Sequence, residues 1–120
     1  MTVMSTILQQ LKDTGADVDG ALARFGGNAA LYEKFLKKFP GDDSFARIEP
    51  AIAAGDHKEM FEAVHSLKGV SGNLGLTGLY QAACSMTELL RAGKDEEAVQ
   101  SYEAVKKEYD KAAEIITRAE

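Results

Sequence analysis

The stretch of residues 63–75, which reads AVHSLKGVSGNLG, most constrains what this chain can fold into. Apolar or small residues recur roughly every 3.5 positions through it, which predicts an amphipathic helix with one buried face. That face comprises Met60, Val64, Leu67, Ser71 and Leu74. Gly75 is of the residue type that most often ends a helix, so we expect the helix to stop there.

A second stripe of the same helix holds aromatic, polar and small residues. It comprises Phe61, His65, Lys68 and Gly72, with Gly69 beside them. Glycine costs a helix about 0.5–1 kcal/mol relative to alanine. Two glycines next to a histidine therefore favour a surface that a second protein approaches closely, and tight packing of a neighbouring helix is the alternative.

His65 is the candidate reactive residue of this stripe. An uncharged imidazole is a nucleophile without help from a general base, and a lysine one turn away disfavours the charged imidazolium. Lys68 is also placed to contact an anion formed on the ring. The alternatives without a chemical role are a structural or merely exposed histidine and a solvated lysine.

The segment HSLKGVSGNLG resembles the signature of histidine-containing phosphotransfer (HPt) domains. The matching positions are His65, Leu67, Lys68, Gly69, Ser71, Leu74 and Gly75. The resemblance implies that His65 accepts a phosphoryl group from the phospho-aspartate of a response-regulator receiver domain and passes it to another receiver. It implies a phosphocarrier without a kinase or nucleotide site, with no cofactor of its own and with Mg²⁺ on the receiver. No glycine-rich phosphate loop is visible in the sequence.

Two further residues have roles that the sequence leaves open. Thr87 lies as far after the turn near residues 75–77 as His65 lies before it, so the two come level in an antiparallel helix pair. Its hydroxyl would stabilise the phosphoryl group, where HPt domains often carry a longer residue such as Gln, or would bond its own helix. Phe61 is either an apolar docking contact or peripheral core.

Helical spacing and cap residues extend over the rest of the chain. We expect a short helix over residues 4–12, whose apolar side comprises Met4, Ile7, Leu8 and Leu11, and a second over residues 17–25 that Asp17 caps. A third helix, capped by Asn28, carries Leu31, Phe35, Leu36 and Phe39. Pro40-Gly41 breaks or kinks that helix, and Pro50 is awkward in the segment that follows. Asp56 and Glu59 have the spacing of a capping box.

The helix that follows the turn begins with Thr77 as its N-cap and stops at Gly93. The last helix begins near Asp95 and has a bundle seam of apolar residues. Together these elements predict an all-α fold with one domain over residues 1–120. We expect residues 28–119 to form an antiparallel up-down four-helix bundle, and short helices within residues 1–27 to cover it.

Composition excludes several kinds of partner. The net charge of −5 argues against nucleic acid, and no apolar run reaches the roughly 18 residues of a membrane span. With one cysteine and no signal peptide in view, we expect a cytoplasmic protein, and we expect a monomer. His57, the only other histidine, lies two turns from His65, so we expect no metal site.

Two other classes of function stay open. One is the phosphoacceptor module of a histidine kinase, against which we note a chain that starts with Met1 and ends inside a helix without a linker. The other is a helical adaptor that is never phosphorylated, which would not need His65, Lys68 and Gly69 together. Acid-labile, alkali-stable phosphate on the protein would separate the adaptor from the phosphocarrier.

Overall fold

The computed structural model describes residues 6–118, and every regular element within that range is helical. The elements in chain order are α1 (Thr6–Asp13), α2 (Val18–Arg24), α3 (Ala29–Lys38), the 3₁₀ turn η1 (Phe39–Gly41), α4 (Ile48–Ala54), α5 (His57–Asn73), α6 (Thr77–Arg91) and α7 (Asp95–Arg118). The all-α prediction is confirmed.

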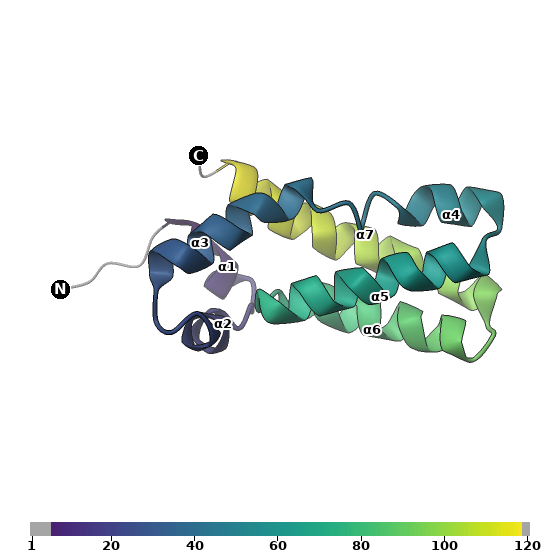
Figure 1. Cartoon of the computed structure of the whole chain (residues 1–120), viewed down its shortest axis with the longest axis horizontal. Helices are drawn as coiled ribbons and strands as arrows, with labels where there is room; N and C mark the ends of the chain where they lie inside the picture. The colour runs from purple at the N-terminus through teal and green to yellow at the C-terminus, as the bar shows by residue number, and fades with distance from the viewer. Residues whose placement is uncertain (1–5, 119–120) are drawn as a thin grey trace.

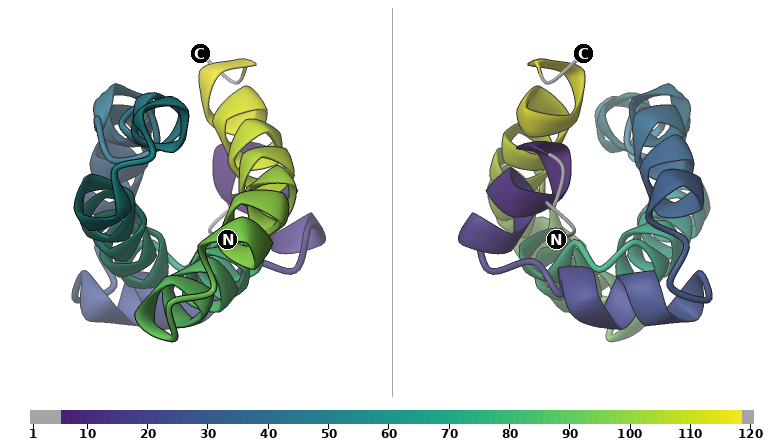
Figure 2. Two further views of the ribbon diagram at one scale, coloured as in Figure 1. Left: turned by 90° about the vertical axis from the view of Figure 1, so that its right-hand side faces the viewer. Right: turned by 90° about the vertical axis from the view of Figure 1, so that its left-hand side faces the viewer.

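The helices form an elongated body with principal extents of 52 × 23 × 20 Å. The long helices α5, α6 and α7 run back and forth, so that α6 packs against both of the others (Figure 1). Helices α3 and α4 follow one another along the opposite edge, where α3 contacts α7 and α4 contacts α5. The end-on views of Figure 2 show these helices arranged around a common axis.

The predicted buried face of α5 is confirmed, since Met60, Val64, Leu67, Ser71 and Leu74 are all at most 4% exposed. The seam of α7 is buried too, through residues that include Ala98, Tyr102 and Val105. Burying a large apolar side chain contributes about 1.5–3 kcal/mol. These faces therefore fix how α5 is rotated, and they turn its second stripe outward.

The proline-glycine pair breaks the helix rather than kinking it. Helix α3 ends at Lys38, and Pro40 lies in η1. Pro50 lies in the first turn of α4, where a backbone N–H has no partner within the helix, so it is tolerated there.

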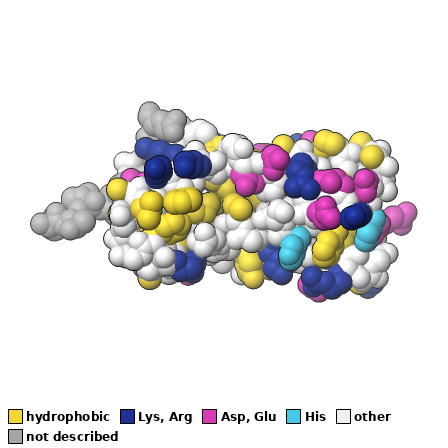
Figure 3. Space-filling model, in the orientation of Figure 1, with side chains coloured by type: hydrophobic (Ala, Val, Ile, Leu, Met, Phe, Trp, Pro, Cys, Tyr) yellow, Lys and Arg dark blue, Asp and Glu magenta, His cyan; other side chains and the backbone are white. Residues whose placement is uncertain are grey.

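The apolar face of α3 differs from the prediction. Leu36 and Phe39 are buried, whereas Leu31 and Phe35 are 38% and 43% exposed. Tyr32 takes the buried position instead, because its hydroxyl donates a 2.7 Å hydrogen bond to the carbonyl of Leu74. Hydrophobic side chains accordingly gather on the surface at the α3 end of Figure 3, beside a group of Lys and Arg side chains, while acidic side chains concentrate toward α4 and the start of α5.

Two predicted caps need correction. Thr77 is the first residue of α6 rather than its N-cap, and its hydroxyl donates to the carbonyl of Gly75 and accepts from the N–H of Asp17. The side chain of Asp56 caps α5 as expected, but Glu59 does not complete a capping box. Its carboxylate accepts a 2.6 Å hydrogen bond from Arg47, which neutralises it more effectively than a backbone amide would.

The two N-terminal helices lie at one end of the molecule (Figure 1). Ile7, Leu8 and Leu11 of α1 are buried, and α1 contacts both α2 and α7. Met4, predicted to share that apolar face, lies outside the described residues. No helix within residues 6–118 is both long enough and apolar enough to cross a membrane.

Candidate functional site

His65 is exposed on the outer face of α5, as the second stripe predicted. Phe61, Lys68 and Gly72 of the same stripe are half-buried, and Gly69 is exposed. Since α5 buries its other face in the core and is capped by Asp56, it presents the imidazole to solvent from a rigid helix.

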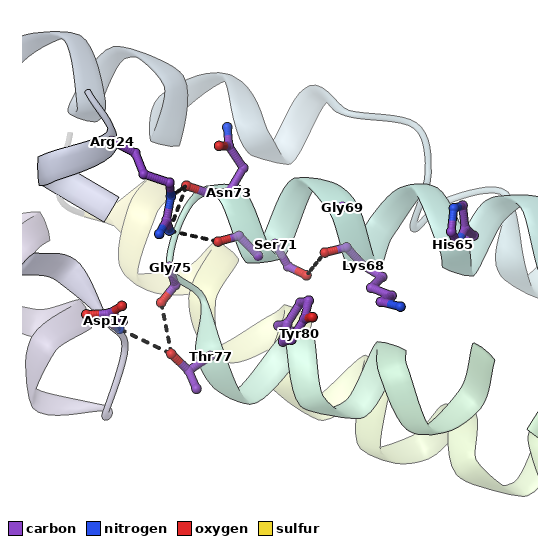
Figure 4. Close-up of a pocket in the computed structure, with 11 residues that line it drawn as sticks. Asp17, Arg24, His65, Lys68, Gly69, Ser71, Asn73, Gly75, Thr77 and Tyr80 are labelled. Atoms are coloured by element: carbon purple, nitrogen blue, oxygen red, sulfur yellow. Dashed lines mark hydrogen bonds between the residues drawn. The ribbon is translucent and has the colours of Figure 1, made fainter. Parts of the chain in front are cut away.

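An open groove of about 610 Å³ begins at His65 and runs toward the C-terminal end of α5 (Figure 4). His65, Lys68 and Gly69 line it from α5, and Tyr80 lines it from α6. Arg24 of α2 lines its far end. The structure therefore brings His65, Lys68, Gly69 and Gly72 onto one surface.

Lys68 forms no ion pair with any residue in the described range 6–118. The 3.1 Å hydrogen bond from the hydroxyl of Ser71 is accepted by the backbone carbonyl of Lys68 and does not involve its ammonium group. A lysine without a carboxylate partner beside an exposed imidazole can neutralise an anion that forms on the ring.

Arg24 is a second cation of the groove, and sequence reasoning missed it. Its guanidinium donates to the carbonyl of Gly72 at 2.9 Å and to that of Asn73 at 3.2 Å (Figure 4). The last carbonyls of a helix lack partners within the helix and carry partial negative charge. Arg24 therefore caps α5, and only the docking of α2 against the α5–α6 turn brings it there.

The two glycines of the groove differ in their surroundings. A Cβ atom on Gly69 would meet nothing within 4 Å, so this backbone is open to an approaching molecule. A Cβ atom on Gly72 would lie 2.9 Å from the ring of Tyr80, which rests over that glycine. Gly72 thus has a packing role between α5 and α6 that Gly69 lacks.

The register of the α5–α6 pair follows from two contacts. Tyr80 lies against Gly72, and the guanidinium carbon of Arg91 lies 5.6 Å from the ring centre of Phe61. The number of residues from Phe61 to Gly72 in α5 equals the number from Tyr80 to Arg91 in α6. The two helices therefore run antiparallel in a constant register, which places Thr87 level with His65 as predicted.

Thr87 nevertheless does not face the groove. It is fully buried, and its hydroxyl donates a 2.7 Å hydrogen bond to the carbonyl of Ala83 in its own helix. The predicted phosphoryl-stabilising role therefore has no support in this geometry, and the alternative of a threonine that bonds its own helix describes what the structure has. Thr87 thus lies level with His65 along the helix pair, as predicted, but its side chain points into the core.

The two histidines have separate surroundings. The Nδ1 atom of His57 lies 2.9 Å from a carboxylate oxygen of Asp95, which joins the beginnings of α5 and α7. The ring of His65 instead lies parallel to that of Phe61. Within residues 6–118, no three His, Cys, Asp or Glu side chains are grouped so as to hold a metal ion.

A family model described as "Hpt domain" matches residues 30–115, which is more than half of the chain. The matched range begins in α3, ends in α7 and includes every candidate site residue on α5 and α6. It leaves α1 and α2 outside, and with them Arg24. Comparisons with curated proteins and with solved structures gave no match.

Proposed function

The chain belongs to the Hpt domain family, whose members are phosphocarrier modules of phosphorelays rather than kinases, and on that premise we propose what this member does. His65 accepts a phosphoryl group from the phospho-aspartate of a receiver domain and passes it to another receiver. The protein is thus an intermediate carrier in a two-component phosphorelay.

One observation carries the proposal: an exposed imidazole shares a groove with an ammonium group that has no ion-pair partner in the described residues. The imidazole belongs to His65 and the ammonium to Lys68. The open backbone at Gly69 lets a second protein approach the same surface. These features support a donor that is itself a protein, because the groove is open to the outside of the molecule rather than enclosed.

The transfer step is a displacement at phosphorus. A ring nitrogen of His65 uses its lone pair to form the N–P bond, and the P–O bond of the acyl phosphate breaks with its electron pair going to the aspartate carboxylate. Lys68 offsets negative charge on the transferred group, and we expect Mg²⁺ on the receiver to do the same from the other side. Passing the group onward reverses these roles.

The wider arrangement belongs to the same proposal. Helices α3 and α4 together fill one position of an up-down four-helix bundle, α5, α6 and α7 fill the other three, and α1 and α2 cover one end. We propose that the single domain acts as a cytoplasmic monomer that meets receivers or a hybrid histidine kinase, and that neither nucleic acid nor membrane is a partner.

Mixing the protein with receivers that carry labelled phosphoryl groups tests the proposal. We expect acid-labile, alkali-stable label on the wild-type protein and none on His65→Gln. His57→Gln is the matched control, because it removes the other exposed histidine from the same helix, and it should take up label normally. Equal loss in both variants would show that the acceptor is misassigned.

The same assay separates the alternatives. Label that arrives only from the ATP-binding domain of a kinase, and never from a receiver, would identify a kinase phosphoacceptor module. Absence of label from any donor, combined with receiver binding that survives His65→Gln, would identify an adaptor.

A further inference from the structure

The imidazole of His65 stacks on an aromatic ring of its own helix. The ring centres of Phe61 and His65 lie 5.7 Å apart, and their planes differ by only 7°. Residues four apart on a helix are neighbours, and an offset parallel pair is a favoured aromatic geometry. One face of the imidazole is therefore directed toward Phe61, while the ring edge that carries the nitrogens stays available.

The ring of Phe61 is itself held from a second helix. The guanidinium of Arg91, on α6, lies 5.6 Å from the ring centre of Phe61, and Arg91 also pairs with Glu88. Phe61 is half-buried and packs against the core at its edge. A ring contacted by Arg91, by His65 and by the core has few positions open to it, so it can serve as a fixed support.

We propose that Phe61 is a positioning residue for His65: its ring fixes the plane of the imidazole so that a ring nitrogen faces an incoming phosphoryl group. This inference rests on the proposed function of His65. Formation of the N–P bond needs the nitrogen lone pair aligned with phosphorus, and an imidazole free to rotate about its Cα–Cβ bond spends part of its time misaligned.

A docking role for Phe61 makes a different kinetic prediction. A docking contact stabilises the complex with the receiver, so its loss raises the receiver concentration needed for half-maximal transfer. A positioning contact acts once the complex has formed, so its loss lowers the maximal transfer rate at saturating receiver. The two effects are separable in one titration.

Phe61→Leu separates them, because leucine keeps an apolar side chain at the site but removes the ring. We expect the maximal transfer rate to fall about fivefold, which corresponds to about 1 kcal/mol and is typical of an aromatic pair. The receiver concentration needed for half-maximal transfer should stay at the wild-type value. Phe61→Tyr, which retains the ring, should behave as wild type. A raised half-saturation with an unchanged maximal rate would overturn the proposal in favour of docking.

A second measurement does not depend on phosphotransfer. In the unphosphorylated protein, we expect the ring current of Phe61 to shift the NMR signals of the His65 ring protons. Phe61→Leu should remove that shift and Phe61→Tyr should keep it. Phe35→Leu is the matched control, since its ring contacts Phe25 and Lys38 rather than His65, and it should leave the signals unchanged. Unaltered His65 signals in Phe61→Leu would show that the ring does not orient the imidazole.

The two arms keep the proposals distinct. If the wild-type protein takes no label from any receiver, the proposed function fails, while the NMR arm still decides whether Phe61 orients His65. If Phe61→Leu does not fold, as judged by circular dichroism, Phe61→Met replaces it, because methionine adapts to irregular apolar sites without supplying a ring.

Discussion

At the scale of single residues, the chemistry depends on what lies beside the imidazole. Lys68 is the cation nearest to His65 along the helix, and it has no carboxylate partner in the described part of the chain. A charge-assisted contact at such a partly exposed position contributes about 1–2 kcal/mol after allowance for solvent screening. Arg24 is a second cation of the groove, but its guanidinium already holds the end of α5.

We therefore expect Lys68→Ala to slow transfer to His65 about tenfold without abolishing it, since about 1.4 kcal/mol is a factor of ten. Lys68→Arg should recover part of the loss because it restores the charge. Higher salt should narrow the gap between wild type and Lys68→Ala, because screening weakens the same contact. Transfer rates for the three proteins at two ionic strengths check this, and an undiminished rate for Lys68→Ala at low salt would leave Lys68 as an ordinary solvated lysine.

Thr87 gives the opposite expectation at the same scale. Its buried hydroxyl donates to the carbonyl of Ala83, which as a helix carbonyl is already paired with a backbone N–H. Thr87→Val should therefore leave the transfer rate unchanged and lower the free energy of unfolding by less than about 1 kcal/mol. Transfer assays and urea unfolding of this variant provide the check. A rate as low as that of Lys68→Ala, in a normally folded protein, would restore the phosphoryl-stabilising role.

At the scale of elements, the turn between α5 and α6 sets the register on which the site depends. The N–H groups of Gly75 and Leu76 donate to the carbonyls of Gly72 and Ser71, which is the hydrogen-bond pattern of a Schellman motif. Gly75 has a φ of +73°, and a Cβ atom there would lie 2.5 Å from the backbone oxygen of Asp17. A glycine is thus required both for the turn and for the approach of α2.

Gly75→Ala should lower the free energy of unfolding by more than the strain of a left-handed backbone conformation alone would do. That conformation costs a residue with a Cβ atom about 1–2 kcal/mol, and overpacking against backbone adds about 1–3 kcal/mol. Gly93→Ala is the matched control, because Gly93 follows α6 with a φ of +76°, but a Cβ atom there would meet nothing within 4 Å. Urea unfolding of both variants measures the difference, and equal losses would mean that α2 moves aside freely.

The elements that sequence reasoning found were those set by short-range rules. Asp17, Asn28 and Asp56 cap helices as predicted, because each side chain bonds an amide three residues ahead. The register of α5 and α6 followed from the short turn between them.

Several of the predictions that failed depended on partners far away in the sequence. Thr77 bonds Asp17 and Gly75 instead of capping α6, Glu59 pairs with Arg47, and Tyr32 is buried because the carbonyl of Leu74 accepts its hydroxyl. The spacing of residues along one helix gives no information about these contacts. For the same reason, Arg24 and the ring of Tyr80 could not be assigned to the groove from the sequence.

At the scale of the whole molecule, the N-terminal third is attached to the end of α5 by polar contacts. The N–H of Asp17 donates to the carbonyl of Gly75 at 2.8 Å, Arg24 donates to that of Gly72, and the hydroxyl of Tyr32 donates to that of Leu74. Helix-end carbonyls need such partners when they are buried. Helix α2 and its cap residue Asp17, which the family match leaves out, therefore help to stabilise the end of the helix that carries His65.

The Tyr32 contact makes this attachment sensitive to alkali. Burial, the largest cause, raises the pKa of Tyr32 from 10.0 to about 12, although the nearby Arg24 acts in the opposite direction. An ionised phenol could not donate to Leu74, so the folded protein holds the proton more tightly than the unfolded chain does. The stabilisation is fully present below pH 10 and is lost as the pH rises toward about 12.

We expect the wild-type protein to lose about 2–3 kcal/mol of unfolding free energy through Tyr32 over that interval, at about 1.36 kcal/mol per unit of pKa. Burial also raises the pKa values of Tyr102 and Tyr109, which adds a loss of the same sign. Tyr32→Phe isolates the contribution of Tyr32: it should be less stable than wild type at about pH 8, where the bond to Leu74 is missing, yet should lose less stability on going to about pH 11.5. Urea unfolding of both proteins at the two pH values measures this, and parallel losses would mean that the Tyr32 hydroxyl ionises as readily in the folded protein as in the unfolded chain.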